Sequence, residues 1–444
     1  MCIRRSPLPN ESVHPPSSGG RFAPYTAPVA TGEGLPGPSP SPAPSLAGVG
    51  AGGAGADAWS RPATTLRTAD FDYDLPPDLV AQVPADPRDA SRLLVIDRAT
   101  GGISHRAFRD LPGLLDPGDV LVVNDSRVIA ARVHVRRATG GRVELLLLRP
   151  ALGGVGIPGD EAPWSPWWEA LVRPANRTRA GEILVARAPE DDSRPGAVGE
   201  LDLRRSRCAT EGEVRVAVGG RLPSGGVAVR FDAPVDAVTA RFGEMPLPPY
   251  VRERLADGSR YQTVYAREAG SAAAPTAGLH FTPALLDAIR ARGVEVVPVT
   301  LHVGADTFLP VRADRIADHP MHAEYAVVPD ATAGAIARAR RAGRRVTCVG
   351  TTAVRATESW ARATGASRDR LPDVGWHGWT RLFLYPGAPF HVVDAMVTNF
   401  HVPRSTLLML VSAFAGSEVV RAAYESAIEA RYRFYSLGDA CLFR

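Results

Sequence analysis

Apolar residues along this chain fall into short runs that are separated by Gly, Pro and Asp turns. Two early runs, 93–97 and 120–124, predict buried strands, because a strand that is covered on both faces shows little polar alternation. Beyond Phe242 the pattern alternates between helix and strand. Thr282 caps the first helix predicted there, and Gly293 ends it. This alternation predicts an α/β domain with a largely parallel sheet.

The later elements of this half follow from the same periodicity. They are the predicted strands 294–303 and 345–349 and the predicted helices 330–342 and 350–360. In open α/β sheets, ligands bind beyond the carboxyl ends of the parallel strands. The polar residues that follow these strands are therefore the first candidates for a functional site.

Residues 129–239 have a different hydrophobic pattern, with short apolar runs at close spacing. Strands are predicted at 143–148, 168–172, 182–185, 214–218 and 227–231. Several short strands between turns favour a small antiparallel β-barrel. It would be inserted into the α/β domain, which then comprises 70–128 and 240–444. The stretches 151–163 and 189–213 are predicted to be long loops of the barrel.

Residues 1–69 are rich in Pro, Gly, Ala and Ser, and 22 of them are Gly or Pro. Such a segment has too little apolar surface to offset the entropy lost on ordering, so we expect a disordered extension. The stretch 48–53 superficially resembles a nucleotide-binding loop. Since it follows no predicted strand and opens no predicted helix, low complexity is the better interpretation.

Composition excludes several classes of chemistry. All 51 basic residues are arginine, which excludes a Schiff-base lysine and a phosphate-binding lysine. The net charge of +4 is compatible with nucleic-acid binding but does not require it. The four cysteines are far apart and form no zinc motif, so a reducing compartment is expected. The apolar run 407–415 is too short to cross a bilayer, and no signal peptide is evident. We expect a cytoplasmic monomer.

Four polar clusters stand where the predicted strands end. They are 275–281, 302–308, 350–355 and 398–403. The third opens a helix, whose free N–H groups favour an anion. Each cluster also has an ordinary structural interpretation, such as a hydrogen-bonding histidine or a capped helix. His319, His322 and Glu324 include metal-ligand types, but without a helix to align them we expect no metal.

Many motifs in these same regions are shared with one enzyme family. They are DFDYDLP (70–76), NDSRVI (124–129), GEMPLPPY (243–250), YQTVY (261–265), APTAGLHF (274–281), LHVGA (301–305), MHAEY (321–325), VGTT (349–352), TNFH (398–401) and YRFYS (432–436). The chain from Asp70 to Phe443 thereby resembles the S-adenosylmethionine:tRNA ribosyltransferase-isomerases of queuosine biosynthesis.

This resemblance implies an α/β domain that is interrupted by a β-barrel, which agrees with the pattern analysis. It also implies that the ribosyl part of S-adenosylmethionine is transferred to 7-aminomethyl-7-deazaguanine at the tRNA wobble position and isomerised. The products would be epoxyqueuosine-tRNA, adenine and methionine. S-adenosylmethionine would be a co-substrate, with no permanently bound cofactor. The partners would be that tRNA and S-adenosylmethionine, with no membrane.

The chemistry of that reaction selects residues within the shared motifs. A base is needed at the ribose carbon beside the sulfonium, and imidazole suits neutral pH. We assign proton transfer to His280 and His302, with His322 and His401 as alternatives. The predicted substrate contacts are Tyr261, Gln262, Tyr265, Thr276, Gly278, Thr351, Thr352, Arg355 and Asn399. The predicted RNA contacts are Arg127, Arg132, Arg136 and Arg137, at the join of domain and barrel.

The sequence also departs from the family it resembles. Asp306 stands where the family usually has Gly, and Ala130 where Pro is usual. Asp306 adds a charge near His302, so a relative with an altered substrate is one alternative. A non-catalytic RNA-binding protein is another, although the barrel region lacks strands that interleave aromatic and basic residues. A conventional methyltransferase would need a Gly-rich loop after its first strand, and none follows residues 93–97.

Overall fold

The computed structural model describes residues 65–151, 166–174, 178–187, 213–222, 226–253, 255, 257–304 and 311–444. All of them belong to one compact unit, Ala56–Arg444. The predicted disordered extension up to residue 64 and, apart from their end residues, the predicted loops 151–163 and 189–213 lie outside the described residues, as does Asp306.

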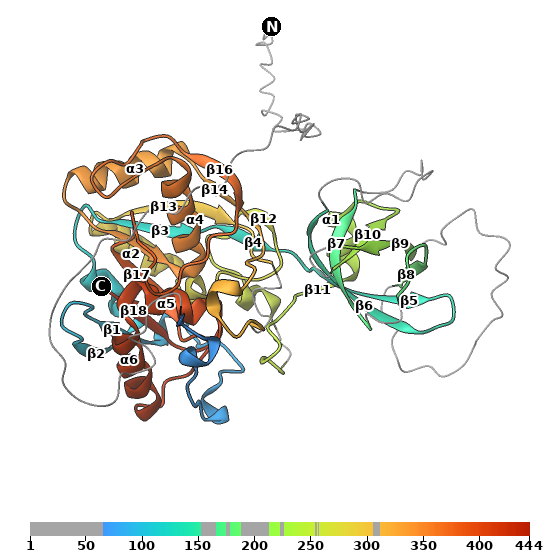
Figure 1. Ribbon diagram of the computed structural model, residues 1–444, viewed down its shortest axis with the longest axis horizontal. Helices are drawn as coiled ribbons and strands as arrows, with labels where there is room; N and C mark the ends of the chain where they lie inside the picture. Colours follow the sequence, from blue (N-terminus) through green and yellow to red (C-terminus); the bar gives the residue numbers. More distant parts are fainter. Residues whose placement is uncertain are drawn as a thin grey trace, which may run out of the picture. The chain divides into compact units, whose positions relative to one another are not determined.

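A mixed nine-stranded sheet forms the centre of the larger domain (Figure 1). Its order is β16 (Trp376–Thr380), β14 (Glu324–Val328), β13 (Glu295–Leu301), β3 (Val120–Asn124), β15 (Val346–Val349), β17 (Ala395–Asn399), β18 (Ala440–Phe443), β1 (Arg92–Ile96) and β2 (Ile103–Ala107). The adjacent strands β13, β3, β15 and β17 run parallel, so their carboxyl ends share one edge. The predicted parallel sheet is confirmed for these four strands, whereas both flanks contain antiparallel pairs.

Helices cover both faces of this sheet, because its central strands are buried on both sides. Along β3, Val122 packs in the apolar cluster that includes α3 (Asp330–Arg341), α4 (Gly350–Ala363), α5 (Thr406–Ala415) and α6 (Ser417–Glu429). The next residue, Val123, packs in the cluster of α2 (Pro283–Ala291) on the other face. Alternate residues of a strand point to opposite faces, so one continuous apolar run supplies two cores.

The predicted helix signals are confirmed at α2. The Thr282 hydroxyl accepts a hydrogen bond from the Leu285 N–H at 3.1 Å, and Pro283 occupies the first helical position. The sequence analysis did not predict α5 and α6. Among the described residues, no single helix is long and apolar enough to span a membrane, although the bent pair α5 and α6 passes that test on length and composition.

The smaller domain is a closed antiparallel β-barrel of six strands. Going around it, these are β5 (Arg132–Arg137), β6 (Arg142–Pro150), β7 (Trp168–Arg173), β10 (Val227–Phe231), β9 (Glu213–Arg221) and β8 (Ile183–Arg187), which pairs with β5. On β5, Val133 and Val135 point inward while Arg136 is exposed. The helix α1 (Val235–Phe242) packs against the same core and ends three residues beyond the predicted boundary at 239.

Two short strands join the barrel region to the larger domain. β11 (Gly243–Glu244) adds to β5, and β4 (Ser126–Val128) pairs in parallel with β12 (Glu268–Ser271).

Residues 65–69 are ordered, so the predicted end of the disordered extension at residue 69 is wrong. Leu66 is only 2% exposed and joins the main apolar cluster. Thr68 donates to the carbonyls of Asp314 at 2.8 Å and Ala313 at 2.6 Å, through its N–H and its hydroxyl respectively. Composition could not indicate this end, because the partners of these residues lie some 245 positions away.

Candidate functional site

A cavity of about 430 Å³ lies at the carboxyl edge of the parallel strands. Its walls come from the segments that follow β15 and β17, from the turn before α2 and from residues 402–407. Five of the predicted contact and catalytic residues line it: Thr276, Thr351, Thr352, Asn399 and His401. Pockets of this volume take small molecules. The expectation that a site forms beyond the strand ends is therefore supported by geometry.

The side chain of Asn124 holds together the segments next to this cavity. Its side-chain N–H₂ donates to the Leu301 carbonyl at 3.1 Å and to the Thr352 hydroxyl at 3.0 Å. Its oxygen accepts from the N–H groups of Leu301 and Ser126 at 3.0 and 3.1 Å. This one buried amide therefore connects β3, β13 and the first turn of α4, and it holds Thr352 at the cavity wall.

A chain of four side chains leads from the protein interior to the cavity wall. The Ser91 hydroxyl lies 2.8 Å from Nδ1 of His280, and Nε2 of His280 lies 3.3 Å from Nδ2 of Asn399. The Thr276 hydroxyl donates to Oδ1 of Asn399 at 2.8 Å. Since an amide nitrogen only donates, Nε2 of His280 is the acceptor and Nδ1 carries the proton. The amide of Asn399 is thereby held in one orientation.

Burial keeps His280 neutral. The ring packs against Phe108, with the ring centroids 4.9 Å apart, and only 5% of the residue is exposed. Desolvation lowers the pKa of His280 to about 4. His280 does not line the cavity but contacts it through Asn399.

His401 is the histidine that lines the cavity. Its Nε2 lies 2.8 Å from the Thr398 hydroxyl, and its backbone N–H donates to the Tyr424 hydroxyl at 2.9 Å. Its Nδ1 has no hydrogen-bond partner within the described part of the chain. Burial lowers the pKa of His401 to about 3, so the neutral ring is the stable form.

Two aromatic residues of the cavity wall received no role from the sequence. Tyr250 and Tyr435 lie with ring centroids 4.8 Å apart, and the Tyr250 hydroxyl lies 2.5 Å from the Ser436 hydroxyl. Burial raises the pKa of Tyr250 to about 12. Tyr435 adopts a φ of 71°, which is uncommon for a residue with a side chain and concentrates at functional sites. Tyr250 belongs to the GEMPLPPY motif and Tyr435 to the YRFYS motif, and these motifs were the signal in the sequence by which both residues could have been identified.

The first turn of α4 faces the same cavity. Gly350 begins the helix with a φ of 84°, and Gly350, Thr351 and Thr352 all line the wall. The first N–H groups of an α-helix have no partner within the helix, and they carry partial positive charge. This end of the cavity therefore favours an anion.

Three other predicted residues lie outside the cavity wall. The ring of His302 packs against Gly270, and burial lowers its pKa. His322 is half-buried just before β14. Arg355 forms a buried ion pair with Glu324 and donates to the Leu382 carbonyl at 3.1 Å. The expectation that Arg355 binds substrate directly finds no support here, because its charge is already matched.

Four predicted contacts lie on either side of Thr276, three before it and one two residues after it. Gln262 bonds both the carbonyl and the N–H of Val128, at 2.7 and 3.1 Å, and so connects the segment around it to β4. Tyr261 is fully buried in an apolar cluster. A Cβ atom at Gly278 would overlap the Tyr265 hydroxyl, so only glycine is accommodated there. These residues shape the site and do not line it.

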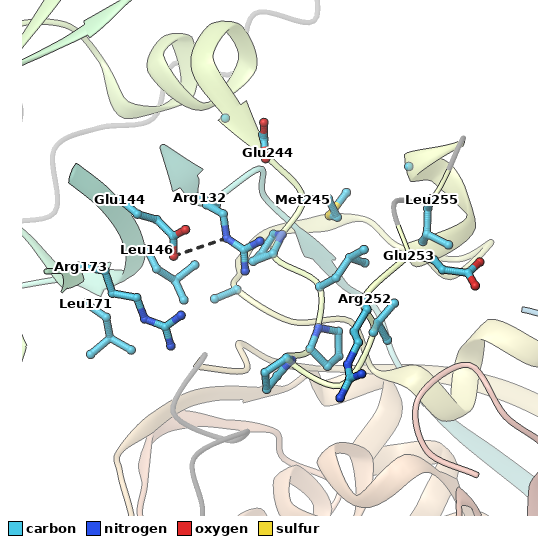
Figure 2. Close-up of a pocket in the computed structure, with 18 residues that line it drawn as sticks. Arg132, Glu144, Leu146, Leu171, Arg173, Glu244, Met245, Arg252, Glu253 and Leu255 are labelled. Atoms are coloured by element: carbon cyan, nitrogen blue, oxygen red, sulfur yellow. Dashed lines mark ion pairs between the residues drawn. The ribbon is translucent and has the colours of Figure 1, made fainter. Parts of the chain in front are cut away.

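The predicted RNA contacts have different environments. Arg127 and Arg136 are exposed, on β4 and β5. Arg137 is paired with Glu182 and donates to Thr178 at 3.1 Å, so its charge is matched. Arg132 lines a second cavity of about 720 Å³, where it lies 3.8 Å from Glu144 (Figure 2). The sequence analysis missed the other arginines of that cavity, Arg173 and Arg252.

Comparisons with known proteins agree on one family. The sequence model described as queuosine biosynthesis protein matches residues 68–443. A relative from Moorella thermoacetica, named S-adenosylmethionine:tRNA ribosyltransferase-isomerase, is 48% identical over 382 residues, which are 85% of this chain and 99% of the relative. A relative of the same name from Rubrobacter xylanophilus is 48% identical over 377 residues, 85% of this chain and 97% of the relative. A crystal structure of the S-adenosylmethionine tRNA ribosyltransferase from Thermotoga maritima is 34% identical, covers 84% of this chain and 99% of that chain, and has a TM-score of 0.44.

Proposed function

Because the chain belongs to the queuosine biosynthesis protein family, we propose that it is a ribosyltransferase-isomerase that uses S-adenosylmethionine and a tRNA. It transfers the ribosyl part of S-adenosylmethionine to the aminomethyl group of 7-aminomethyl-7-deazaguanine at the wobble position and isomerises it. Epoxyqueuosine-tRNA, adenine and methionine are the products. S-adenosylmethionine is a co-substrate, and the proposed chemistry requires no permanently bound cofactor.

The observation that carries this proposal is the convergence of separate motifs on one cavity. The TNFH, VGTT and APTAGLHF motifs all contribute lining residues, and so does the end of GEMPLPPY. These motifs are far apart in sequence, and only the sheet edge brings them together. The cavity volume of about 430 Å³ is in the range of small-molecule sites.

The charge distribution of the cavity matches two charged groups of S-adenosylmethionine, the methionyl carboxylate and the sulfonium. The methionyl carboxylate is placed at the first turn of α4, where Thr351 and Thr352 offer free N–H groups and hydroxyls. The sulfonium cation is placed by the faces of Tyr250 and Tyr435, since aromatic faces attract cations. This wall also suits a cation, because the positive charge of the nearby Arg404 is already balanced by Asp72.

His401 is the proposed base at the ribose carbon beside the sulfonium. It borders the cavity, and its neutral ring offers Nδ1 for a proton. Burial makes the imidazolium form costly, so the proton cannot stay on His401 without compensation. The carboxylate of the bound co-substrate supplies a negative charge in the same cavity, and it reduces that cost.

His280 is a positioning residue in this proposal. Through its bond to Asn399 it orients the amide that faces the cavity, and Ser91 fixes which ring nitrogen carries the proton. The two amide hydrogens of Asn399 are taken by His280 and the Tyr435 carbonyl, so its Oδ1 is left to accept a second hydrogen bond, from the amino group of the leaving adenine or from the incoming amine. A residue that acts through another alters the geometry of the reaction without touching the reacting atoms.

The activity assay uses an anticodon stem-loop that bears the deazaguanine base, with S-adenosylmethionine and the purified chain. We expect adenine and methionine to be released in equal amounts, and the RNA mass to increase accordingly. Transfer of a methyl group, with S-adenosylhomocysteine as by-product, would contradict the proposal. So would the absence of any product while the RNA and S-adenosylmethionine both bind.

We also propose that the enzyme acts as a monomer in the cytoplasm. Light scattering of the purified protein tests this directly. A mass of twice 47.1 kDa would contradict it.

A further inference from the structure

A second cavity of about 720 Å³ lies beside the cavity just described. Pro249 lines both cavities, Tyr250 lines the smaller one and Val251 the larger one. The segment 249–251 therefore separates two neighbouring binding spaces. One wall of the larger cavity comes from the barrel strands β5, β6 and β7, and the opposite wall comes from residues 243–258 (Figure 2).

The charged side chains of this second cavity are not all neutralised by one another. Arg132 lies 3.8 Å from Glu144, and Glu244 lies 3.6 Å from His134. Within the part of the chain that the structure describes, neither Arg173 nor Arg252 has a side-chain hydrogen bond or ion pair.

The remaining acidic residue of the lining, Glu253, is exposed, and in Figure 2 its carboxylate extends away from Arg132 and Arg173. Arg173 and Arg252 lie on opposite sides of the cavity, so two unpaired guanidinium groups flank it. This arrangement offers two separate contacts to a ligand that carries negative charge along its length.

Part of the wall between these arginines is apolar, although Arg132 and Glu144 also border the cavity. The apolar part is formed by Leu146, Leu171, Met245, Pro246, Leu247 and Pro248. An aliphatic surface between cations suits a ligand that has flat apolar faces joined by negatively charged groups. An unstacked nucleotide has this character, since its base packs on apolar or guanidinium surfaces while its phosphates bind arginine.

We propose that this second cavity binds single-stranded RNA next to the reacting base, with Arg173 and Arg252 on its phosphates. This inference rests on the proposed function, because it assigns a place to the RNA substrate of that reaction. The shared wall at Pro249 lets one strand place consecutive nucleotides in the two cavities. Loop nucleotides can be splayed out in this way, whereas paired bases cannot.

The test compares the double variant Arg173→Ala/Arg252→Ala with the parent chain. A transcribed anticodon stem-loop, without the deazaguanine base, is the probe, and its binding is followed by fluorescence anisotropy over a range of salt concentrations. Arg341→Ala is the matched control, because Arg341 is an exposed residue at the end of α3. Thermal melting checks that every variant is folded, and Arg173→Lys/Arg252→Lys restores the charge without the planar group.

We expect the alanine double variant to bind the RNA at least tenfold more weakly. The slope of log affinity against log salt should become shallower by about 0.7 for each phosphate that the variant no longer neutralises. The control should behave as the parent, and the lysine variant should recover most of the affinity. Binding of S-adenosylmethionine should not change in any of these proteins.

An unchanged RNA affinity and salt slope in the folded double variant would overturn the inference, as would a parent chain that does not bind the RNA. The adenine-release assay separates this outcome from a failure of the proposed function. If the parent chain releases adenine and the double variant binds RNA as the parent does, only the proposed RNA site is contradicted. If the parent chain releases no adenine but its RNA binding depends on these two arginines, only the proposed reaction is contradicted.

Discussion

Burial sets the protonation state of the histidines at and behind the cavity. His280 and His401 are both enclosed and held neutral, but only His401 borders the space where a substrate would lie. His302 precedes Val303, which lines the cavity, and its own ring packs against Gly270. Adjacent residues of an extended segment point in opposite directions, so Val303 faces the cavity while the ring of His302 points away from it. This separates His302 in function from His401, which borders the cavity.

Replacing His401 with Gln should reduce adenine release by about a hundredfold or more, because a general base acts in the transition state. The dissociation constant for S-adenosylmethionine, measured by calorimetry, should change little. His302→Ala serves as the comparison and should keep activity within a few-fold. A loss confined to the His302 variant would instead identify His302 as the base.

Gly278 is expected to tolerate no side chain. Gly278→Ala would place a Cβ against the Tyr265 hydroxyl, and such overpacking costs about 1–3 kcal/mol of the free energy of unfolding. Urea denaturation measures this cost. Adding Tyr265→Phe removes the overlapping oxygen but leaves Thr263 Cγ2 at 2.8 Å and Tyr265 Cζ at 2.9 Å from the new Cβ, so it should recover only part of the loss. Gly113→Ala, which meets nothing within 4 Å, should be nearly neutral. Equal stability of the Gly278 and Gly113 variants would contradict the packing argument.

At the scale of elements, the buried ion pair between Arg355 and Glu324 connects α4 to the start of β14. Glu324 also accepts the Gly304 N–H at 3.1 Å, so the pair orders the end of β13 as well. These contacts place the first turn of α4 relative to the sheet edge. We therefore propose that Arg355 holds the first turn of α4 in position.

We expect Arg355→Met to destabilise the fold by about 3–5 kcal/mol, because it removes the arginine partner of the buried Glu324 carboxylate. The double variant Arg355→Met/Glu324→Gln should recover part of that loss in chemical denaturation. The KM for S-adenosylmethionine should stay within a few-fold in the double variant. A stable single variant with a KM raised more than tenfold would restore a direct substrate contact for Arg355.

At the scale of the whole molecule, the described chain begins with residues that pack on the larger domain. A protein that starts at Thr64 keeps Leu66 and the bonds from Thr68, whereas one that starts at Asp70 lacks both. We expect the first truncation to melt within about one degree of the full chain. The second should melt several degrees lower, since it exposes apolar surface and removes three hydrogen bonds to residues 313–316 together with the ion pair between Arg67 and Asp314. Equal melting temperatures of the two truncations would show that residues 64–69 add nothing.

Acid should destabilise the folded chain through its buried histidines. The pKa of His280 is lowered from 6.5 to about 4, so the unfolded chain binds a proton more readily than the folded one. Its contribution to stability is complete above about pH 6.5 and is lost as the pH falls towards 4, by about 3 kcal/mol in all. His280→Asn should reduce this pH dependence in urea denaturation, while the exposed His377→Asn should leave it intact. A parent chain that is equally stable at pH 7 and pH 4.5 would contradict this assignment.

Local pattern determined much of the architecture. Apolar runs and their turns indicated the central strands and most of the barrel strands, and cap residues indicated α2 to α4, because these signals act over a few neighbouring positions. Shared motifs indicated the family. The antiparallel pairing of β18 with β17 was not predicted, since these two strands meet only through long-range pairing.

The tertiary structure alone decided which candidates meet. The sequence indicated four polar clusters at strand ends, because parallel strands end at a common edge. Only the fold selected Thr276, Thr351, Thr352, Asn399 and His401 from the candidates as residues of one cavity. The direction of each side chain, and the partner that already holds it, depended on the packing of distant elements. That packing directs the ring of His302 towards Gly270 and pairs Arg355 with Glu324 and Arg137 with Glu182. It also brought Tyr250 and Tyr435 together across 185 positions of sequence, which no local pattern can encode.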